Sequence, residues 1–214
     1  MKYEGIIFDL DGVIVDTAKY HFLAWKRLAK ELEIDFTKDD NERLKGVSRM
    51  TCMGIILELG NREMSEEKMV ELTTRKNEWY LEYVNQMDAS EILPGSIEMI
   101  NTLKDMGVKI SIGSASKNAK TILKKVGLID QFDFISDGTI VTKAKPDPEV
   151  FTIAADEMGV EYEKCIVFED SEAGIEAAKR VDMLAVGIGS KENLPASDMI
   201  FSGLDEVNIK EIIK

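Results

Sequence analysis

The sequence has few cysteines and no arrangement that pairs them. Cys52 and Cys165 are the only two, they lie far apart, and neither belongs to a Cys-x-x-Cys pair. This pattern excludes a disulfide framework and a zinc site built on cysteine spacing. Two reduced thiols are typical of a protein from the reducing cytosol, and we therefore expect a cytoplasmic location.

Long apolar runs are also absent. No stretch approaches the roughly 18 consecutive apolar residues that a membrane span needs. The first residues, Met-Lys-Tyr-Glu-Gly-Ile-Ile-Phe-Asp, reach carboxylates almost at once, so we expect no secretory leader. The sequence thus predicts no membrane partner.

Basic residues are fewer than acidic residues. Lysine and arginine number 27 against 40 aspartates and glutamates, which gives a net charge of −13. Such a chain repels polyanions, so we expect no nucleic acid as a partner. A small phosphorylated substrate is still compatible with this charge, because a local cluster of cations outweighs the global field at short range.

What is present is typical of a soluble globular protein. Hydrophobic residues make up 44% and charged residues 31% of 214 residues. That length predicts one domain, or one domain with an insertion, and it buries ~70% of the extended surface. We expect a monomer, with which an acidic soluble chain is compatible.

In the first half of the chain, the spacing of the apolar residues changes from that of a strand to that of a helix. The apolar segment Ile6–Phe8 predicts a short buried parallel strand. Phe22, Trp25, Ala29 and Leu32 are then spaced as one face of a helix, and we expect them to form packing core. Further helices are predicted at Met50–Leu59 and Ser65–Met87, and no convincing strand occurs between about residues 36 and 91.

The second half alternates regularly after Pro94-Gly95. Helices are predicted at Ser96–Met106, Asn118–Val126, Pro148–Met158 and Ser171–Arg180, and strands at Val108–Ile112, Phe134–Ile135, Cys165–Phe168 and Met183–Val186. This order predicts an α/β fold, a doubly wound parallel sheet core with an inserted α-helical cap domain. We assign residues 1–16 and 94–214 to the core and residues 17–93 to the cap, with hinges near Asp16-Thr17 and Pro94-Gly95.

Polar groups follow each predicted core strand. They are Asp9-Leu10-Asp11-Gly12, Gly113-Ser114-Ala115-Ser116-Lys117, Lys145-Pro146-Asp147 and Glu169-Asp170-Ser171. Because ligands bind beyond the carboxyl ends of strands in doubly wound sheets, we expect these groups to meet at the rim of one site.

The carboxylates among these groups predict a metal. Four of them in a small pocket repel one another unless a cation lies between them, and Mg²⁺ prefers oxygen ligands. One aspartate can then attack phosphorus, while a second, two residues on, exchanges a proton with the substrate oxygen. Ser114 and Lys145 are suited to hold the remaining phosphoryl oxygens.

These motifs resemble a known family. Asp9-x-Asp11-Gly12-Val13, Ser114, Lys145 and Glu169-Asp170 are similar, in order and spacing, to the four motifs of the haloacid dehalogenase superfamily of phosphotransferases. The cap resembles that of its β-phosphoglucomutase subgroup. The segments that carry this second resemblance are Thr17–Phe22, Ala24–Lys26, Leu44–Arg49, Arg75–Asn77 and Ser114–Asn118.

The resemblance implies a role for each matching residue. It implies that Asp9 accepts the phosphoryl group, that Asp11 is the general acid and base, and that both bind Mg²⁺. The other implied metal residues are Glu169 and Asp170. Ser114 and Lys145 would bind the transferring phosphoryl group, and Thr17 and His21 would assist Asp11 and cap closure. The implied substrate-binding residues are Lys45, Gly46, Val47, Ser48, Arg49, Lys76, Ser116, Lys117 and Asn118, with Arg49 on the second phosphate.

The implied reaction interconverts β-D-glucose 1-phosphate and D-glucose 6-phosphate through an aspartyl phosphate and β-glucose 1,6-bisphosphate. The small partners are thus a phosphorylated sugar and this bisphosphate. Two alternatives stay open: a Mg²⁺-dependent sugar-phosphate phosphatase on the same scaffold, and a phosphosugar-binding protein without turnover.

Several of these residues also have purely structural interpretations. Glu169-Asp170 could cap the following helix, Ser114 could cap another, and Lys145 could be a solvated surface lysine. A lone helical histidine such as His21 is more often structural than catalytic. The presence of all four motifs in order favours the catalytic interpretation.

Overall fold

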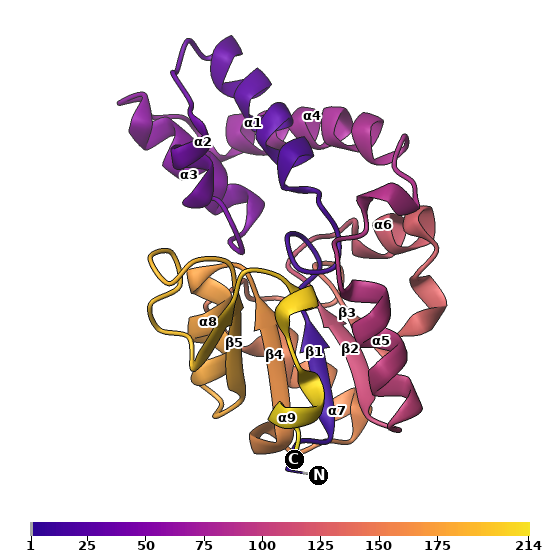
Figure 1. Cartoon of the computed structure of the whole chain (residues 1–214). Helices are drawn as coiled ribbons and strands as arrows, with labels where there is room; N and C mark the ends of the chain where they lie inside the picture. The colour runs from indigo at the N-terminus through magenta and orange to yellow at the C-terminus, as the bar shows by residue number, and fades with distance from the viewer. Residues whose placement is uncertain (1) are drawn as a thin grey trace.

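A six-stranded parallel sheet forms the centre of one half of the molecule in the computed structural model, which describes residues 2–214 (Figure 1). The strands are β1 (Gly5–Phe8), β2 (Lys109–Gly113), β3 (Phe134–Ser136), β4 (Cys165–Glu169), β5 (Leu184–Ile188) and β6 (Met199–Phe201). Their order is β3-β2-β1-β4-β5-β6, and every pair is parallel. The later strands therefore lie on both sides of β1, with β2 and β3 on one side and β4 to β6 on the other. The order reverses between β1 and β4, and this is the topological switch point where such sheets bind ligands.

Both faces of the first strand are buried. Ile6 and Phe8 belong to one apolar cluster, and Ile7, which points to the opposite face, belongs to another. Phe8 stacks on Phe168 of β4 with ring centroids 5.3 Å apart. This alternation explains why a run of apolar residues, rather than an alternating pattern, marks the strand.

Helices cover both faces of the sheet. They are α5 (Ser96–Asp105), α6 (Ala119–Val126), α7 (Glu149–Met158), α8 (Glu172–Lys179) and α9 (Ile209–Ile212), with 3₁₀ turns at Ala89–Glu91, Ile129–Gln131, Tyr162–Lys164 and Leu204–Glu206. α5, α6 and α9 pack into the cluster that holds Ile6, whereas α7 and α8 pack into the cluster that holds Ile7. The doubly wound α/β architecture predicted from the alternation is confirmed.

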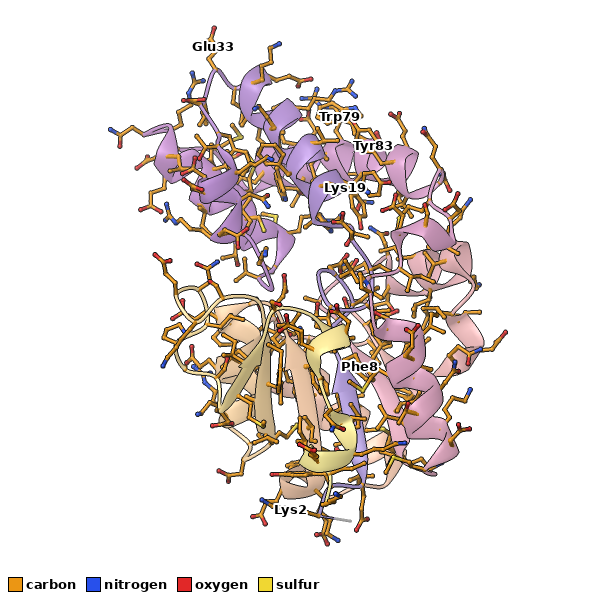
Figure 2. The ribbon with its side chains drawn as sticks, viewed as in Figure 1. Lys2, Phe8, Lys19, Glu33, Trp79 and Tyr83 are labelled. Atoms are coloured by element: carbon orange, nitrogen blue, oxygen red, sulfur yellow. The ribbon has the colours of Figure 1, made fainter. Side chains whose placement is uncertain are left out.

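Four helices between β1 and β2 form the other half of the molecule (Figure 1). They are α1 (Ala18–Glu31), α2 (Lys38–Glu42), α3 (Arg49–Leu59) and α4 (Glu66–Val84). Of these, α1, α3 and α4 share an apolar cluster around Trp25, Met53 and Trp79, and Figure 2 shows Trp79 and Tyr83 on α4, away from Phe8 in the sheet. The exact boundaries of core and cap remain a prediction.

The differences from the sequence-based elements have local causes. Short α2 is entirely polar and has no apolar period, while β6 is a three-residue edge strand; neither was predicted. Ser171, not Glu169 or Asp170, is the N-cap of α8, and Asn118, not Ser114, precedes α6. The Lys145–Pro146 peptide bond is cis. None of the helices described between residues 2 and 214 is long and apolar enough to cross a membrane.

Candidate active site

A cavity of about 340 Å³ lies where the carboxyl ends of the central strands face the helical half. Its walls come from the loops after β1, β2, β3 and β4, and from helices α1 to α4. A volume of this size is typical of a small-molecule site. Of the residues predicted for the site, all line this cavity except Thr17 and Glu169.

Those two exceptions support pocket residues from behind. The hydroxyl of Thr17 donates a hydrogen bond to Oδ1 of Asp11. Glu169, which is completely buried, accepts a hydrogen bond from Lys145 with its Oε2 at 2.8 Å. The structure therefore brings the four predicted motifs to one place.

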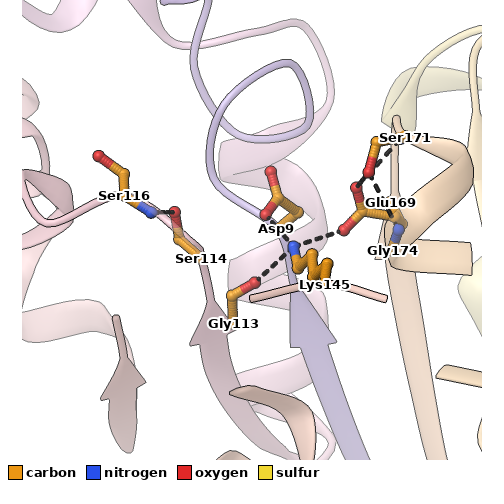
Figure 3. Close-up of polar contacts among 8 residues, drawn as sticks. All are labelled: Asp9, Gly113, Ser114, Ser116, Lys145, Glu169, Ser171 and Gly174. Carbon is orange, nitrogen blue, oxygen red and sulfur yellow. Dashed lines mark hydrogen bonds and ion pairs between the residues drawn. The ribbon is translucent and has the colours of Figure 1, made fainter. Parts of the chain in front are cut away.

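The Lys145 ammonium group is the centre of this cluster (Figure 3). It donates to Oδ1 of Asp9 at 2.6 Å, to Oε2 of Glu169 at 2.8 Å and to the carbonyl oxygen of Gly113 at 3.1 Å. Burial alone would lower the pKa of Lys145, but the charges of Asp9 and Glu169 outweigh it and hold this pKa above its ordinary value. Lys145 is thus a buried cation, not a solvated one.

Lys145 alone does not neutralise the carboxylates around it. Burial, followed by the charge of Glu169, raises the pKa of Asp9 well above its ordinary value. Burial likewise raises the pKa of Asp170 to about 7, although Lys45 opposes this shift. One further cation in the cluster would relieve both shifts.

The donor set fits a hard divalent ion. Asp9, Glu169 and Asp170 each offer a carboxylate oxygen, and the three oxygens lie within 4.8 Å of one another. Oxygen-only ligands of this charge suit Mg²⁺. Both oxygens of Glu169 are already hydrogen-bonded, Oε2 to Lys145 and Oε1 to Ser171, so Asp9 and Asp170 have more free ligand capacity than Glu169.

Glycine at position 12 keeps this cluster compact. Gly12 has φ +90°, and a Cβ atom there would lie 2.3 Å from Oδ2 of Asp170. A side chain would therefore clash with a candidate metal ligand and require an unfavourable backbone conformation. This close approach explains why glycine follows Asp11.

Asp11 is held on the cap side of the cluster. Its Oδ1 atom accepts the Thr17 hydrogen bond, and Nε2 of His21 lies 3.9 Å from the same oxygen. Burial raises the pKa of Asp11, and the Thr17 hydrogen bond opposes that shift. A largely buried carboxyl group with one fixed oxygen is suited to proton exchange with a bound substrate.

His21 sits between Asp11 and Lys76. Its Nδ1 atom lies 3.0 Å from Nζ of Lys76, and its ring stacks on Tyr80 with centroids 4.0 Å apart. Burial, with the neighbouring cations Lys76 and Arg49, holds the pKa of His21 well below its ordinary value. Burial also lowers the pKa of Lys76 to about 7. His21 is therefore neutral near pH 7.

A second set of polar groups lines the cavity around Arg49. Arg49 on α3 donates to Oδ1 of Asn77 at 2.8 Å, and Nδ2 of Asn118 donates to the same oxygen at 3.0 Å. Asn77 thus connects cap and core beside Arg49. Ser116 and Lys117 line the cavity beside these residues.

Two further contacts join the cap loop to the core. Lys45 lies 3.1 Å from Oδ2 of Asp170. Gly46 has φ +70°, and a Cβ atom on it would lie 2.3 Å from Oγ of Ser171. The predicted loop residues therefore lie against the candidate metal cluster. Ser48 has a structural role as well, because it caps α3 through the backbone N–H of Thr51.

The cavity also contains residues that sequence reasoning did not assign to it. Asn77 bridges Arg49 and Asn118, and its sequence signal was its place in the segment Arg75–Asn77, which carries part of the family resemblance. Trp25 packs in the cap cluster, as its helical spacing predicts, but it also lines the cavity. Cys52, to which the sequence assigned no place, does the same. Asn41 lies in short, polar α2 and had no sequence signal.

Comparison with known proteins agrees with this geometry. Residues 3–182 match the model of a hydrolase family, described as haloacid dehalogenase-like hydrolase. A β-phosphoglucomutase of Bacillus subtilis is 40% identical over 209 residues, which cover 97% of this chain and 92% of that protein. A phosphorylated carbohydrates phosphatase of Thermotoga maritima is 30% identical and covers 82% of this chain and 80% of its own.

A solved structure is similar over the whole molecule. The crystal structure of β-phosphoglucomutase from Clostridium difficile superposes with a TM-score of 0.93 and 40% identity, covering 98% of this chain and 95% of that one. The similarity therefore includes the helical half as well as the sheet.

Proposed function

The chain belongs to the haloacid dehalogenase-like hydrolase family, and from this we propose that it is a β-phosphoglucomutase that interconverts β-D-glucose 1-phosphate and D-glucose 6-phosphate. One observation carries the proposal: a nucleophile centre at Asp9 and a separate cationic group at Arg49 on α3 line one cavity. A sugar carrying two phosphates needs both groups at once. The 40% identity to a β-phosphoglucomutase over 97% of the chain supports the same reaction.

Phosphoryl transfer would begin at Asp9. A carboxylate oxygen of Asp9 attacks the phosphorus of the bisphosphate, an aspartyl O–P bond forms and the sugar O–P bond breaks. Lys145, already bonded to Asp9, and Ser114, which is buried beside it, would stabilise the negative charge on the phosphoryl oxygens. Asp11 donates the proton to the leaving sugar oxygen.

The second half of the reaction uses the same groups in reverse. Asp11 removes the proton from a sugar hydroxyl, and that oxygen takes the phosphoryl group from Asp9. The hydrogen bond from Thr17 fixes one oxygen of Asp11, which directs the other toward the substrate. Arg49 would hold the phosphate that is not transferred, because its planar fork suits phosphate oxygens.

A metal ion completes the site. Mg²⁺ would be held by the carboxylates of Asp9 and Asp170, and Glu169 would add negative charge beside it. The backbone carbonyl of Asp11 is a further candidate ligand. When bound, Mg²⁺ supplies charge stabilisation for the transferring phosphoryl group.

The cap would keep water away from the aspartyl phosphate. We propose that residues 17–93 move as the cap and residues 1–16 and 94–214 as the core. The two connections run side by side, because Asp16 N–H donates to Glu91 and Leu93 N–H donates to Ile14. Lys45–Asp170 and Asn77–Asn118 join the cap to the core across the cavity, which supports a closed arrangement during transfer.

An anomer-resolved assay tests the proposed function. Purified protein with Mg²⁺, β-glucose 1-phosphate and a trace of the bisphosphate should produce glucose 6-phosphate, and the α anomer should not react. Release of inorganic phosphate instead would favour the phosphatase alternative, which the Thermotoga relative represents. Saturable binding without either product would indicate a phosphosugar-binding protein.

We also infer that one chain is sufficient for activity. A single chain supplies Asp9, Arg49 and the candidate metal cluster. Light scattering coupled to gel filtration should therefore show an active peak with the mass of a monomer.

A further inference from the structure

Asn41 differs from the other polar residues that the cap contributes to the cavity. Its side chain is 7% exposed, and its Oδ1 atom is buried without any hydrogen-bond partner in residues 2–214. Among the buried unpartnered side-chain atoms of these residues, it is the one whose residue lines the cavity. A buried polar group without a partner is uncommon and requires an explanation.

The neighbouring polar groups of the cap all have partners. Lys45 pairs with Asp170, Arg49 donates to Asn77, and Lys76 lies within hydrogen-bond distance of His21. Ser48 is occupied by the start of α3. The nearby cap residues Leu44 and Val47 are apolar and offer no side-chain donor, and the indole N–H of Trp25 does not bond to Asn41. No group in residues 2–214 therefore bonds to Oδ1 of Asn41.

The short helix that carries Asn41 is held firmly in place. Thr37 and Asp40 form a reciprocal capping box at its start. Arg43, two residues after Asn41, donates to Glu58 of α3. Asn41 itself uses its backbone N–H and C=O inside the turn, bonding to Thr37 and Leu44. The side chain is thus presented to the cavity by a fixed backbone, and its free oxygen is not explained by a loose segment.

The missing partner must donate a hydrogen bond. A phosphate dianion only accepts hydrogen bonds, and it would be repelled by a carbonyl oxygen, so it cannot fill this position. A sugar hydroxyl donates and accepts, and it satisfies either end of the carboxamide. The proposed phosphate positions, Asp9 and Arg49, line the same cavity as Asn41.

We propose that Asn41 recognises a ring hydroxyl of the sugar and so determines which phosphorylated sugars are used. The inference rests on the proposed function, because it concerns the substrate of that same site. Without substrate, the unpaired carboxamide destabilises the protein; with substrate, it selects sugars that present a hydroxyl at this position.

The first test uses a replacement of the same branched shape. Asn41→Leu removes the unpaired polar group and keeps the number of non-hydrogen side-chain atoms, so the unliganded variant should melt roughly 2–4 °C above the wild type. A purely structural Asn41, bonded within the fold, would instead give a lower melting temperature, and that result would overturn the proposal. Asn85→Leu, at an exposed cap position outside the cavity, is the matched control and should show no rise.

The second test removes hydroxyls from the substrate. Conversion of β-glucose 1-phosphate and its 2-, 3- and 4-deoxy analogues is followed by ³¹P NMR. Asn41→Leu should lower kcat/KM for the complete sugar by roughly 10-fold or more. For the analogue that lacks the recognised hydroxyl, wild type and variant should be equal. An equal loss on all four sugars, or no loss on any, would overturn the proposal.

The two hypotheses fail in different ways. If the wild type releases phosphate and forms no glucose 6-phosphate, the mutase proposal fails. The same deoxy series, followed by phosphate release, then still compares Asn41→Leu with wild type. A hydroxyl-specific loss would support Asn41 as a sugar contact, and a uniform loss would overturn it.

Discussion

At the scale of single residues, the Lys145 ammonium group uses its hydrogen bonds inside the protein. It bonds to Asp9, Glu169 and the Gly113 carbonyl, and so holds the ends of β1, β2 and β4 together. A lysine with these partners serves both structure and chemistry, because it neutralises carboxylates before substrate binds and phosphoryl oxygens afterwards.

Replacing Asp9 by asparagine removes the nucleophile and keeps the shape. We expect Asp9→Asn to lower mutase kcat by roughly 10³-fold or more, because no other group can form the aspartyl phosphate. The coupled assay for glucose 6-phosphate measures this loss. Asp16→Asn is the control, since Asp16 is half exposed and its side chain pairs with Lys19 at the surface. Retained turnover in Asp9→Asn would show that another residue accepts the phosphoryl group.

Arg49 distinguishes a mutase from a simple phosphatase. Arg49→Ala should reduce mutase kcat/KM by roughly 10²-fold, because charge-assisted hydrogen bonds to one phosphate contribute about 1.5–3 kcal/mol. Hydrolysis of p-nitrophenyl phosphate, which has no second phosphate, should change much less. Arg62→Ala removes an exposed cap arginine that pairs with Glu33 and serves as the control. Equal losses in both reactions would contradict the role of Arg49 on a second phosphate.

At the scale of elements, α4 connects the cap to the chemistry. Lys76 and Asn77 reach the cavity, Trp79 packs in the cap cluster, and Tyr80 stacks beneath His21. Successive residues of one helix point in different directions, so a single helix serves the pocket and the core at once. Its position depends on how well its first turn is held.

The start of α4 makes a testable contribution to stability. Ser65 accepts a hydrogen bond from the backbone N–H of Lys68, and Glu66 and Glu67 complement the positive end of the helix. Ser65→Ala should lower the free energy of unfolding by about 1 kcal/mol in urea titrations. Ser202→Ala, at an exposed position outside the helices, should change it less. A Ser65→Ala protein as stable as wild type would show that solvent caps the helix equally well.

At the scale of the whole molecule, the closed cavity buries charge that the fold must tolerate. Lys76 is 4% exposed, and its Nζ lies 4.4 Å from the centroid of the Trp25 ring and 5.1 Å from that of Tyr80. Burial lowers the pKa of Lys76 from 10.5 to about 7. The unfolded chain therefore binds more protons than the folded one between these two pH values.

This difference predicts how stability depends on pH. Stability rises with pH wherever the unfolded state binds more protons, so the cost of burying Lys76 is greatest below pH 7 and fades as pH approaches 10.5. Lys76→Met should therefore stabilise the protein most at pH 6, and its advantage over wild type should shrink by roughly 2 kcal/mol at pH 9. Urea unfolding of both proteins at the two pH values measures the change. An advantage that is independent of pH would show that Lys76 is charged in the folded protein.

Much of the site was predictable because its chemistry follows the ends of strands. Asp9, Ser114 and Glu169 lie at or directly after β1, β2 and β4, and the carboxyl ends of parallel strands share one edge. The helices and strands were predictable for a different reason: most of them bury an apolar face, which repeats in the sequence with the period of the element. Polar α2 lacks such a face, and β6 is an edge strand of only three residues, too short to show a period, so the sequence pattern missed both.

The sequence by itself determined the fold class, the order of the motifs and the residue types at the phosphoryl-transfer centre, because these depend on local pattern and on the direction of the strands. Only the tertiary structure decided that Asn77 bridges Arg49 and Asn118, and that Lys45 pairs with Asp170. It also decided that Asn41 faces the cavity without a partner. Such pairings join residues far apart in the chain, and whether a polar group is satisfied depends on everything packed around it.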